Sequence, residues 1–411
     1  MSADPQESSS WELWPSGVDP SARWILIGRG LRGFCDGFVA VLLPAYLIVL
    51  GLGVIEVGVL STITLAGSAA ATLALGAFGH RWPKRRLLLG AALLMAATGL
   101  GFAGLDSFWP LTVVAFVGTL NPSAGDVSVF LPIEHAELAQ AAQSSDARTT
   151  LFARYSLVGS LCAAFGALAA GVPNMLVSYA GWSLAHALRA MFMLYAAVGL
   201  TVWVLYSRLP ITVAASTQTA ASLGPSRSLV IRLAALFCID SFAGGLLVNA
   251  LLALWLFERF GLSLAAAGSF FFWAGLLTTA SQLLAPAVAR RIGLLNTMVF
   301  THIPASVFLI IAALVPSLPL ALACLLARSA LSQMDVPTRS AFVMASVTPP
   351  ERAAAASFTA VPRSLASAIG PSIGGALLAS GMLAAPLLLC GGLKIVYDLA
   401  LLYAFRNQRI E

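Results

Sequence analysis

The sequence predicts an all-α protein that crosses a membrane many times. Of its 411 residues, 59% are hydrophobic and only 10% are charged, whereas about 25% of the residues of a soluble domain carry a charge. Long apolar runs recur along the whole chain. A bilayer core is crossed by about 20 apolar residues in a helix, and lipid offers no partner to a free backbone amide. These runs are therefore predicted to be transmembrane helices.

Twelve spans are predicted by hydropathy, six on each side of a polar break. The first six cover 23–50, 54–79, 86–105, 109–133, 148–171 and 186–207. The last six cover 228–257, 263–289, 294–316, 318–343, 353–381 and 383–405. The break at 208–227 is a predicted cytoplasmic linker between two six-helix bundles, 23–207 and 228–405.

The two ends of the chain are predicted to be tails. Residues 1–22 are polar and rich in Ser and Pro, so we expect a disordered tail. They lack the basic start, short apolar core and cleavage site of a signal peptide. Residues 406–411 form the second predicted tail.

Basic loop residues predict the orientation. Nearly all of them fall on one side of the predicted spans: Arg81, Lys84, Arg85, Arg86, Arg148, Arg208, Arg227, Arg290, Arg291, Arg352, Arg406 and Arg409. The opposite loops hold essentially only Arg259. By the positive-inside rule, both termini are predicted to be cytoplasmic, in agreement with an even number of spans. Two lysines beside 21 arginines favour a GC-rich bacterial source, and so a bacterial plasma membrane.

The two predicted halves repeat each other weakly. Asp36 in "CDGF" and Asp240 in "IDSF" are 204 residues apart. The same offset aligns "RTTLFARYSLVGSLCAAFGALAAG" (148–171) with "RAAAASFTAVPRSLASAIGPSIGG" (352–375). Two equivalent charges at one fixed offset in two separate places indicate an internal repeat.

Two parallel six-helix halves joined by a cytoplasmic linker are typical of the major facilitator superfamily, which the chain resembles over nearly its whole length. The family's loop between the second and third helices carries a Gly, an Asp-Arg and a Gly-Arg-Arg cluster. "GAFGHRWPKRR" (76–86) keeps the first Gly and the basic cluster, with His80 where the acid is usual. "PAVARRIG" (286–293) repeats the position in the second half. These residues are either topology signals or a conformational latch: Gly76, His80, Arg81, Arg85, Arg290 and Arg291.

A second motif is rich in glycine. "GPSIGG" (370–375) resembles the family's antiporter signature, although it lies in the eleventh predicted span rather than the fifth. Gly370, Gly374 and Gly375 are expected to let helices approach closely, and Pro371 permits a kink.

Charges inside the predicted spans mark the candidate site, because a charge at the bilayer centre is costly. Arg29, Arg32 and Asp36 share one face of the first span, and we expect Arg32 to pair with Asp36. In the resembled family the first, fourth, seventh and tenth helices line a central cavity, with the fifth and eleventh contributing. The other candidates lie on these helices: Asn121, Asp126, Asp240, Arg328, Asp335 and Arg363.

Structural interpretations stay open beside the functional ones. Asp126 and Asp335 can be gating or structural pairs near the cytoplasmic end, and Arg32–Asp36 can be a purely structural pair. Asp240 and Arg363 have no obvious local partner, which favours a role in the cavity. Lys394 and Asp398 are expected to neutralise each other in the twelfth span. "EHAE" (134–137) is expected to be a solvated helix extension.

The predicted function is secondary active transport by alternating access. There is no GxxxxGK[ST] motif for ATP hydrolysis, no HExxH or CxxC metal motif, and no paired GxGD motif of a membrane protease. We therefore expect no enzyme activity, no cofactor and no metal. The formal charge of +6 reflects the basic loops rather than nucleic-acid binding.

Several finer points follow as expectations. Asp36 and Asp240 are the candidates for proton coupling, because a carboxylate in a partly dry cavity titrates more readily. General resemblance favours efflux of a drug-like or amphipathic metabolite, which we expect to be coupled to protons. A monomer is expected, because one chain of this fold can enclose the pathway. The alternatives are uptake or exchange of a small organic anion, which arginines bind well, and a non-transporting sensor on the same fold.

Overall fold

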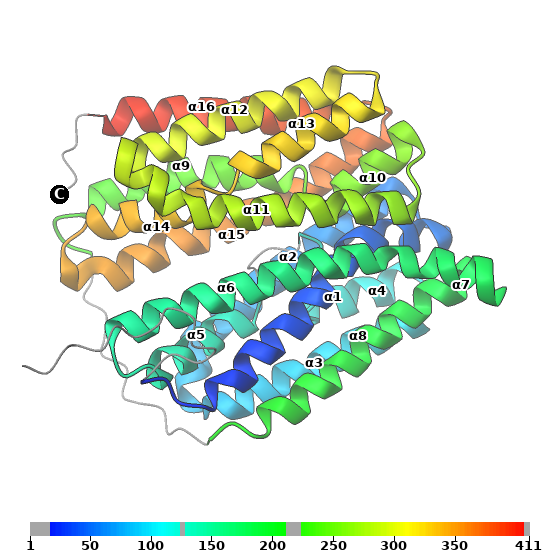
Figure 1. Ribbon diagram of the computed structural model, residues 1–411, viewed down its shortest axis with the longest axis horizontal. Helices are drawn as coiled ribbons and strands as arrows, with labels where there is room; N and C mark the ends of the chain where they lie inside the picture. Colours follow the sequence, from blue (N-terminus) through cyan, green and yellow to red (C-terminus); the bar gives the residue numbers. More distant parts are fainter. Residues whose placement is uncertain (1–16, 124–127, 211–222, 407–411) are drawn as a thin grey trace, which may run out of the picture.

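The computed structural model describes residues 17–123, 128–210 and 223–406, apart from the side chains of His80, Ser145 and Ala353. These residues are nearly all helical, and the long helices run roughly along one direction (Figure 1). Val18 forms an isolated antiparallel bridge with Ala142, which holds the chain before the first helix against the loop after α5. The prediction of an all-α protein is confirmed.

The helices before residue 207 agree with the predicted spans to within a few residues at most boundaries. In chain order they are α1 (Ala22–Val49), α2 (Val54–Phe78), η1 (Gly79–Arg81), α3 (Lys84–Gly104), α4 (Phe108–Val117), α5 (Phe130–Ala141), α6 (Ser145–Leu168), η2 (Ala169–Gly171), α7 (Val172–Ala180) and α8 (Leu184–Tyr206). The fifth predicted span comprises α6 and η2, and α7 continues beyond it.

The helices after residue 226 agree in the same way. In chain order they are α9 (Arg227–Gly245), α10 (Asn249–Phe260), α11 (Leu264–Ile292), α12 (Leu294–Leu314), α13 (Leu318–Leu331), α14 (Asp335–Ala345), η3 (Pro349–Glu351), α15 (Arg352–Ala379) and α16 (Ala385–Phe405). Most of the predicted linker, 211–222, lies outside the described residues.

Three predicted spans are broken helices. The fourth is divided into α4 and α5, the seventh into α9 and α10, and the tenth into α13 and α14. Pro122 follows α4 and Pro337 lies in the first turn of α14, and each lacks the amide that a continuous helix needs. The break after α9 follows Gly244 and Gly245, which are poor helix formers.

Nine helical segments of the described chain are long and apolar enough to cross a membrane. The two that contain α4 with α5 and α13 with α14 are not among them, and neither is α15. These three segments nevertheless lie at the fourth, tenth and eleventh predicted spans. The number of twelve crossings and the cytoplasmic placement of the termini stay predictions.

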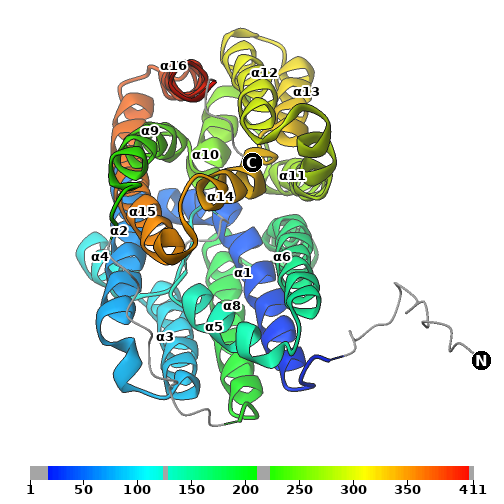
Figure 2. The ribbon, with the colours of Figure 1, turned by 90° about the vertical axis from the view of Figure 1, so that its left-hand side faces the viewer.

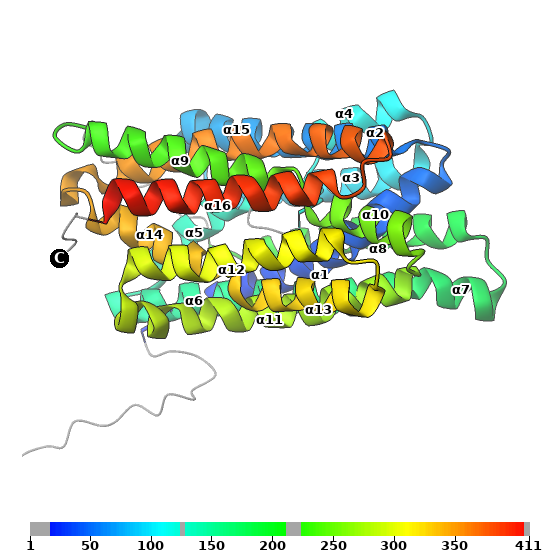
Figure 3. The same ribbon diagram turned by 90° about the horizontal axis from the view of Figure 1, so that it is seen from above.

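The two halves of the chain lie side by side. Figure 2 looks along the helices from the end where α5 and α14 lie, with the helices of the second half above those of the first. Within the halves, α1 packs on α6, α3 on α8, α9 on α15 and α12 on α16. Between them, α2 packs on α15, α6 on α11 and α1 on α10. Figure 3 shows α16, α12 and α13 on the face of the second half that lies away from the first.

The closest of these contacts between helices occur at glycine residues. A Cβ atom on Gly166 would overlap the backbone carbonyl of Phe34, and one on Gly37 would overlap that of Ala163. The helices α1 and α6 therefore touch backbone to backbone at two levels. Only glycine fits at these positions without moving a helix.

One acidic side chain anchors the start of the second half. Glu351, in the turn before α15, accepts hydrogen bonds from the Gly224 amide at 2.6 Å, the Ser226 hydroxyl at 2.7 Å and the Thr348 hydroxyl at 2.6 Å. The bonds from Thr348 and Ser226 lower the pKa of Glu351 from 4.5 to about 2. The ionised form therefore holds the end of the linker against the turn before α15.

We expect Glu351→Ala to lower the melting temperature of the detergent-solubilised protein at pH 7. Because the pKa is lower in the folded state, the contribution of Glu351 is fully present above pH 4.5 and is lost as the pH falls toward about 2. The difference in melting temperature between variant and parent should therefore shrink over that range. Glu258→Ala, at an exposed position of α10, serves as the control. A difference that grows on acidification contradicts the expectation.

Candidate functional site

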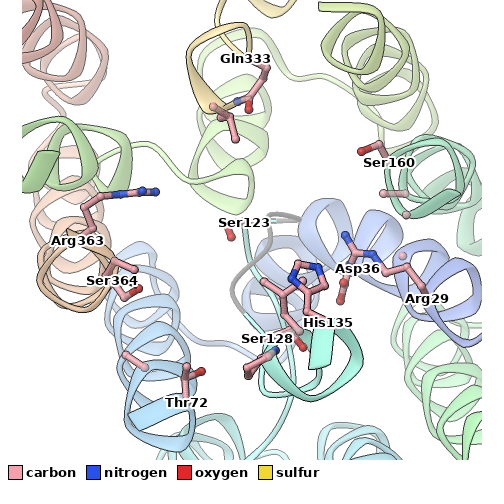
Figure 4. A pocket seen from close by; sticks show the side chains of 18 of the residues that line it. Arg29, Asp36, Thr72, Ser123, Ser128, His135, Ser160, Gln333, Arg363 and Ser364 are labelled. Carbon is pink, nitrogen blue, oxygen red and sulfur yellow. Dashed lines mark hydrogen bonds between the residues drawn. The ribbon is translucent and has the colours of Figure 1, made fainter. Parts of the chain in front are cut away.

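A large central cavity lies between the two halves. Its volume is about 1570 Å³, and its walls come from α1, α2, α3, α5 and α6 of the first half and from α10, α11, α13, α14 and α15 of the second. It extends to the end of the molecule that carries the basic loops, where Trp82, Lys84 and Gln140 line it. Figure 4 shows Arg363 reaching toward the cavity from α15, opposite Arg29 and Asp36 on α1.

This cavity is lined by four of the residues that were predicted for the substrate site or for proton coupling. They are Arg29, Asp36, Arg328 and Arg363. The latch candidate Gly76 also lines it. Because Lys84 adds a fourth cation, the described wall carries four permanent positive charges and one carboxylate, Asp36. The rest of its polar surface comes from neutral side chains such as Thr72, Ser160 and Gln333.

The cavity is closed at the opposite end by direct contacts between the halves. A Cβ atom on Gly375 of α15 would lie 2.8 Å from the Cα atom of Gly58 on α2. One turn away, the amide and hydroxyl of Ser372 bond to the Thr62 hydroxyl at 2.9 and 2.8 Å. The amide of Ala250 also donates to the carbonyl of Pro122 at 3.0 Å. The described chain is thus sealed at one end of the cavity only.

The three glycines of the motif at 370–375 have different partners. A Cβ on Gly370 would overlap the Gly245–Leu246 peptide, and one on Gly374 would overlap the carbonyl of Leu246. Both positions pack α15 within the second half. Gly375 alone of the three packs against the first half.

A buried cluster fixes α5 in the first half. Glu134 of α5 is fully buried and binds the guanidinium of Arg32 on α1 at 2.5 Å. It also accepts hydrogen bonds from the hydroxyls of Tyr155 on α6, at 2.5 Å, and Tyr206 on α8. Arg32 therefore binds Glu134 rather than Asp36, and the expectation of a solvated "EHAE" segment is wrong. The cause is the break in the fourth span, which turns this face of α5 toward α1.

A second cluster, which we call the Asp240 network, lies in the second half. Asp240 of α9 binds Lys394 of α16 at 2.6 Å and Arg339 of α14 at 3.0 Å. Arg339 also binds Asp335 at 2.6 Å. The expected Lys394–Asp398 pair is wrong, because Asp398 instead lies 3.0 Å from a ring nitrogen of His302 on α12. Asp240 is buried and has partners on two other helices. The spacing of residues within α9 does not predict these partners.

A small side chamber adjoins the central cavity at this network. Its volume is about 90 Å³, and Asp240, Asp335, His302 and Lys394 are among its wall residues. Arg328, Ser332, Gln333 and Val336 line both spaces. The break between α13 and α14 thus separates the cavity from the chamber.

The remaining predicted residues lie elsewhere. Asn121 is buried and accepts bonds from the amide and hydroxyl of Ser123 at 3.1 and 2.7 Å, which stabilises the chain after α4. Asp126 lies outside the described residues. Arg85 donates to the carbonyl of Ser207, and Arg81 lies over the ring of Phe78. Arg290 and Arg291 are exposed at the end of α11, and nothing is described for the His80 side chain.

Several site residues were missed by reasoning from sequence. Glu134, Tyr155 and Tyr206 complete the cluster around Arg32, and His302 completes the Asp240 network. A signal existed for two of them. His302 is a polar residue inside a predicted span and Glu134 directly follows one, and such residues need partners when they are buried.

Comparison with known proteins gives consistent matches. Residues 25–331 match the family model of the Major Facilitator Superfamily. An uncharacterized membrane protein of Saccharomyces cerevisiae, YJR124C, is 24% identical over 388 residues, which cover 85% of this chain and 86% of the yeast protein.

Two solved structures show the same fold. A variant of the nucleoside transporter NupG superposes with a TM-score of 0.73 and 16% identity, over 94% of this chain and all of that one (100%). A D-xylose–proton symporter gives a TM-score of 0.72 and 16% identity, over 92% of this chain and 97% of that one.

Proposed function

Because the chain belongs to the Major Facilitator Superfamily, we propose that it carries a small polar solute through its central cavity by alternating access. The observation that supports this most directly is a cavity shared by both halves and sealed at one end only. Rocking of the halves about that site would open the sealed end and close the other. Membership in a transporter family also supports the prediction that the chain is not an enzyme.

The charge of the cavity favours an organic anion as the solute. Four cations and one carboxylate line the described wall. Even with Lys84 paired to Glu137 at 3.8 Å, the cations outnumber the carboxylate, so an amphipathic cation would meet a surplus of like charge. Guanidinium groups bind carboxylates with two parallel hydrogen bonds. Of the two substrate classes that the sequence leaves open, the organic anion therefore has the better support. Export from the cytoplasm, a bacterial plasma membrane and a monomeric state stay part of the proposal.

Proton coupling is proposed to reside at Asp36. Its carboxylate lines the central cavity, where both solute and water can reach it. Asp240, the second candidate, is already bound by Lys394 and Arg339 in the side chamber. A carboxylate on the cavity wall lies on the path of the solute, whereas Asp240 lies behind Arg328 and is held by two cations.

We expect Asp36→Asn to abolish proton movement that accompanies solute flux. The amide keeps the size of the side chain and cannot carry the proton. The test uses proteoliposomes with a pH-sensitive dye inside and a panel of organic anions and cations outside. Asp240→Asn is the comparison, and it should lower protein stability more than it changes the proton-to-solute ratio.

Other outcomes of this assay are informative. Proton movement that persists in Asp36→Asn contradicts the role assigned to Asp36. Flux without proton movement favours exchange of anions. Absence of flux for every compound, together with tight binding of one of them, supports a sensor rather than a transporter.

A further inference from the structure

We propose that the side chamber binds the carboxylate group of the transported solute, while the rest of the solute occupies the central cavity. The inference rests on the proposed function and specifies that its substrate carries a carboxylate group. Four observations carry it: the position of Arg328, the charge of the chamber wall, an unsatisfied buried hydroxyl, and the volume of the chamber.

Arg328 stands between the two spaces. It lies near the end of α13 and lines both the central cavity and the side chamber. Within the described chain, this guanidinium makes no hydrogen bond and no ion pair, although the neighbouring Arg339 has two carboxylate partners. An arginine inside a membrane protein is costly without a counter-charge, so a partner from outside the chain is indicated.

The cations of the chamber wall outnumber its carboxylates by one. Asp240 and Asp335 are the carboxylates of the wall, and Arg328, Arg339 and Lys394 are its permanent cations. Asp240 and Asp335 are matched by Arg339 and Lys394 within the Asp240 network. His302 also faces the chamber, and its charge when protonated would be balanced by Asp398 behind it. The surplus charge therefore belongs to Arg328, and it matches a single negative charge.

A buried hydroxyl without a partner lies in the same wall. Ser306 of α12 is 2% exposed, and within the described chain its Oγ makes no hydrogen bond. Serine in a helix usually bonds to the carbonyl one turn earlier when nothing else is available. A free buried hydroxyl calls for a partner, and a carboxylate oxygen accepts its hydrogen bond.

The volume sets the size of the group. The chamber encloses about 90 Å³, and a water molecule needs about 10–15 Å³ measured in this way. A carboxylate with its first carbon fits, whereas the body of a metabolite needs the central cavity. Ser332 and Gln333, which line both spaces, lie where the two parts of the solute would join.

Acetate is a suitable probe, because it is little more than the group in question. Saturation-transfer NMR on the full-length protein in detergent should detect acetate binding at millimolar concentration, and acetamide of the same shape should give no transfer. Arg328→Gln should weaken acetate binding about tenfold or more, because it removes a charge-assisted bond. Ser306→Ala should weaken it to a smaller extent. Arg259→Gln is the control, since this arginine at the end of α10 lines neither space, and binding should persist.

The results also separate this inference from the proposed function. If the wild-type protein transports a solute but shows no acetate transfer, or if Arg328→Gln binds acetate normally, the assignment of the chamber is overturned and the transport proposal stands. If no solute is transported but acetate binds through Arg328, the transport proposal fails and the chamber remains a carboxylate site. In an active preparation, acetate should inhibit solute flux competitively, and acetamide should not.

Discussion

Gly375→Val is expected to lower the transport rate about tenfold, because it separates the halves where they seal the cavity. The new side chain would meet the backbone of α2 at Gly58, which has no room to move aside. Forcing extra atoms into such a contact costs about 1–3 kcal/mol, which shifts a two-state equilibrium by a factor of roughly 5–150. The state sealed at this end should therefore become the minor one.

A distance measurement tests this directly. Spin labels at Ile55 and Met382, both exposed near the sealed end, should move apart in the variant, in a background without the five native cysteines. Gly90→Val is the control, since a Cβ at Gly90 meets no atom within 4 Å. Gly374→Val should lower stability without separating the labels, because Gly374 packs within its own half. Unchanged label distances in Gly375→Val would show that this contact does not govern closure.

Glu134→Ala is expected to lower the free energy of unfolding by about 3–5 kcal/mol, the range found when one partner of a buried ion pair is removed. The variant leaves Arg32, which is 3% exposed, without its carboxylate and leaves two tyrosine hydroxyls without an acceptor. Unfolding in mixed micelles, followed by circular dichroism, measures the loss.

The matched control is an ion pair of the same length at the surface. Arg189 binds Asp106 at 2.5 Å, but the two side chains are 34% and 59% exposed. Asp106→Asn should therefore cost at most about 1 kcal/mol. In addition, Arg32→Met combined with Glu134→Met should recover much of the stability lost in the single variant, because no charge is then left buried. Equal losses for Glu134→Ala and Asp106→Asn would contradict the role given to burial.

The fold could be predicted from the sequence because lipid leaves few choices. Apolar runs of sufficient length must be helices, so α1, α2 and α8 begin and end within a few residues of the prediction. The breaks were harder to predict. The position of a proline does not give the position of the break directly, because the break before α14 depends on Pro337, whose effect falls on the preceding turn.

The sequence predicted several residues of the site, but it did not predict which of them form ion pairs with each other. Helical spacing places Arg32 near Asp36 and Lys394 near Asp398, and it provides no information about other helices. In the folded chain, Glu134 binds Arg32 and Asp240 binds Lys394, while Asp398 faces His302. Partners about a hundred residues apart are decided by how the helices pack, which a single sequence does not reveal.

The pairing of Arg32 with Glu134 also bears on how the protein is made. The two residues are 102 positions apart, and a ribosome adds about 5–20 residues per second. The first helix must therefore wait for roughly 5–20 s, with an arginine that costs about 2.5–3.5 kcal/mol in mid-membrane, before its counter-charge is synthesised. We expect α1 to stay beside the insertion machinery until α5 has emerged, so that the first half assembles as one unit rather than helix by helix.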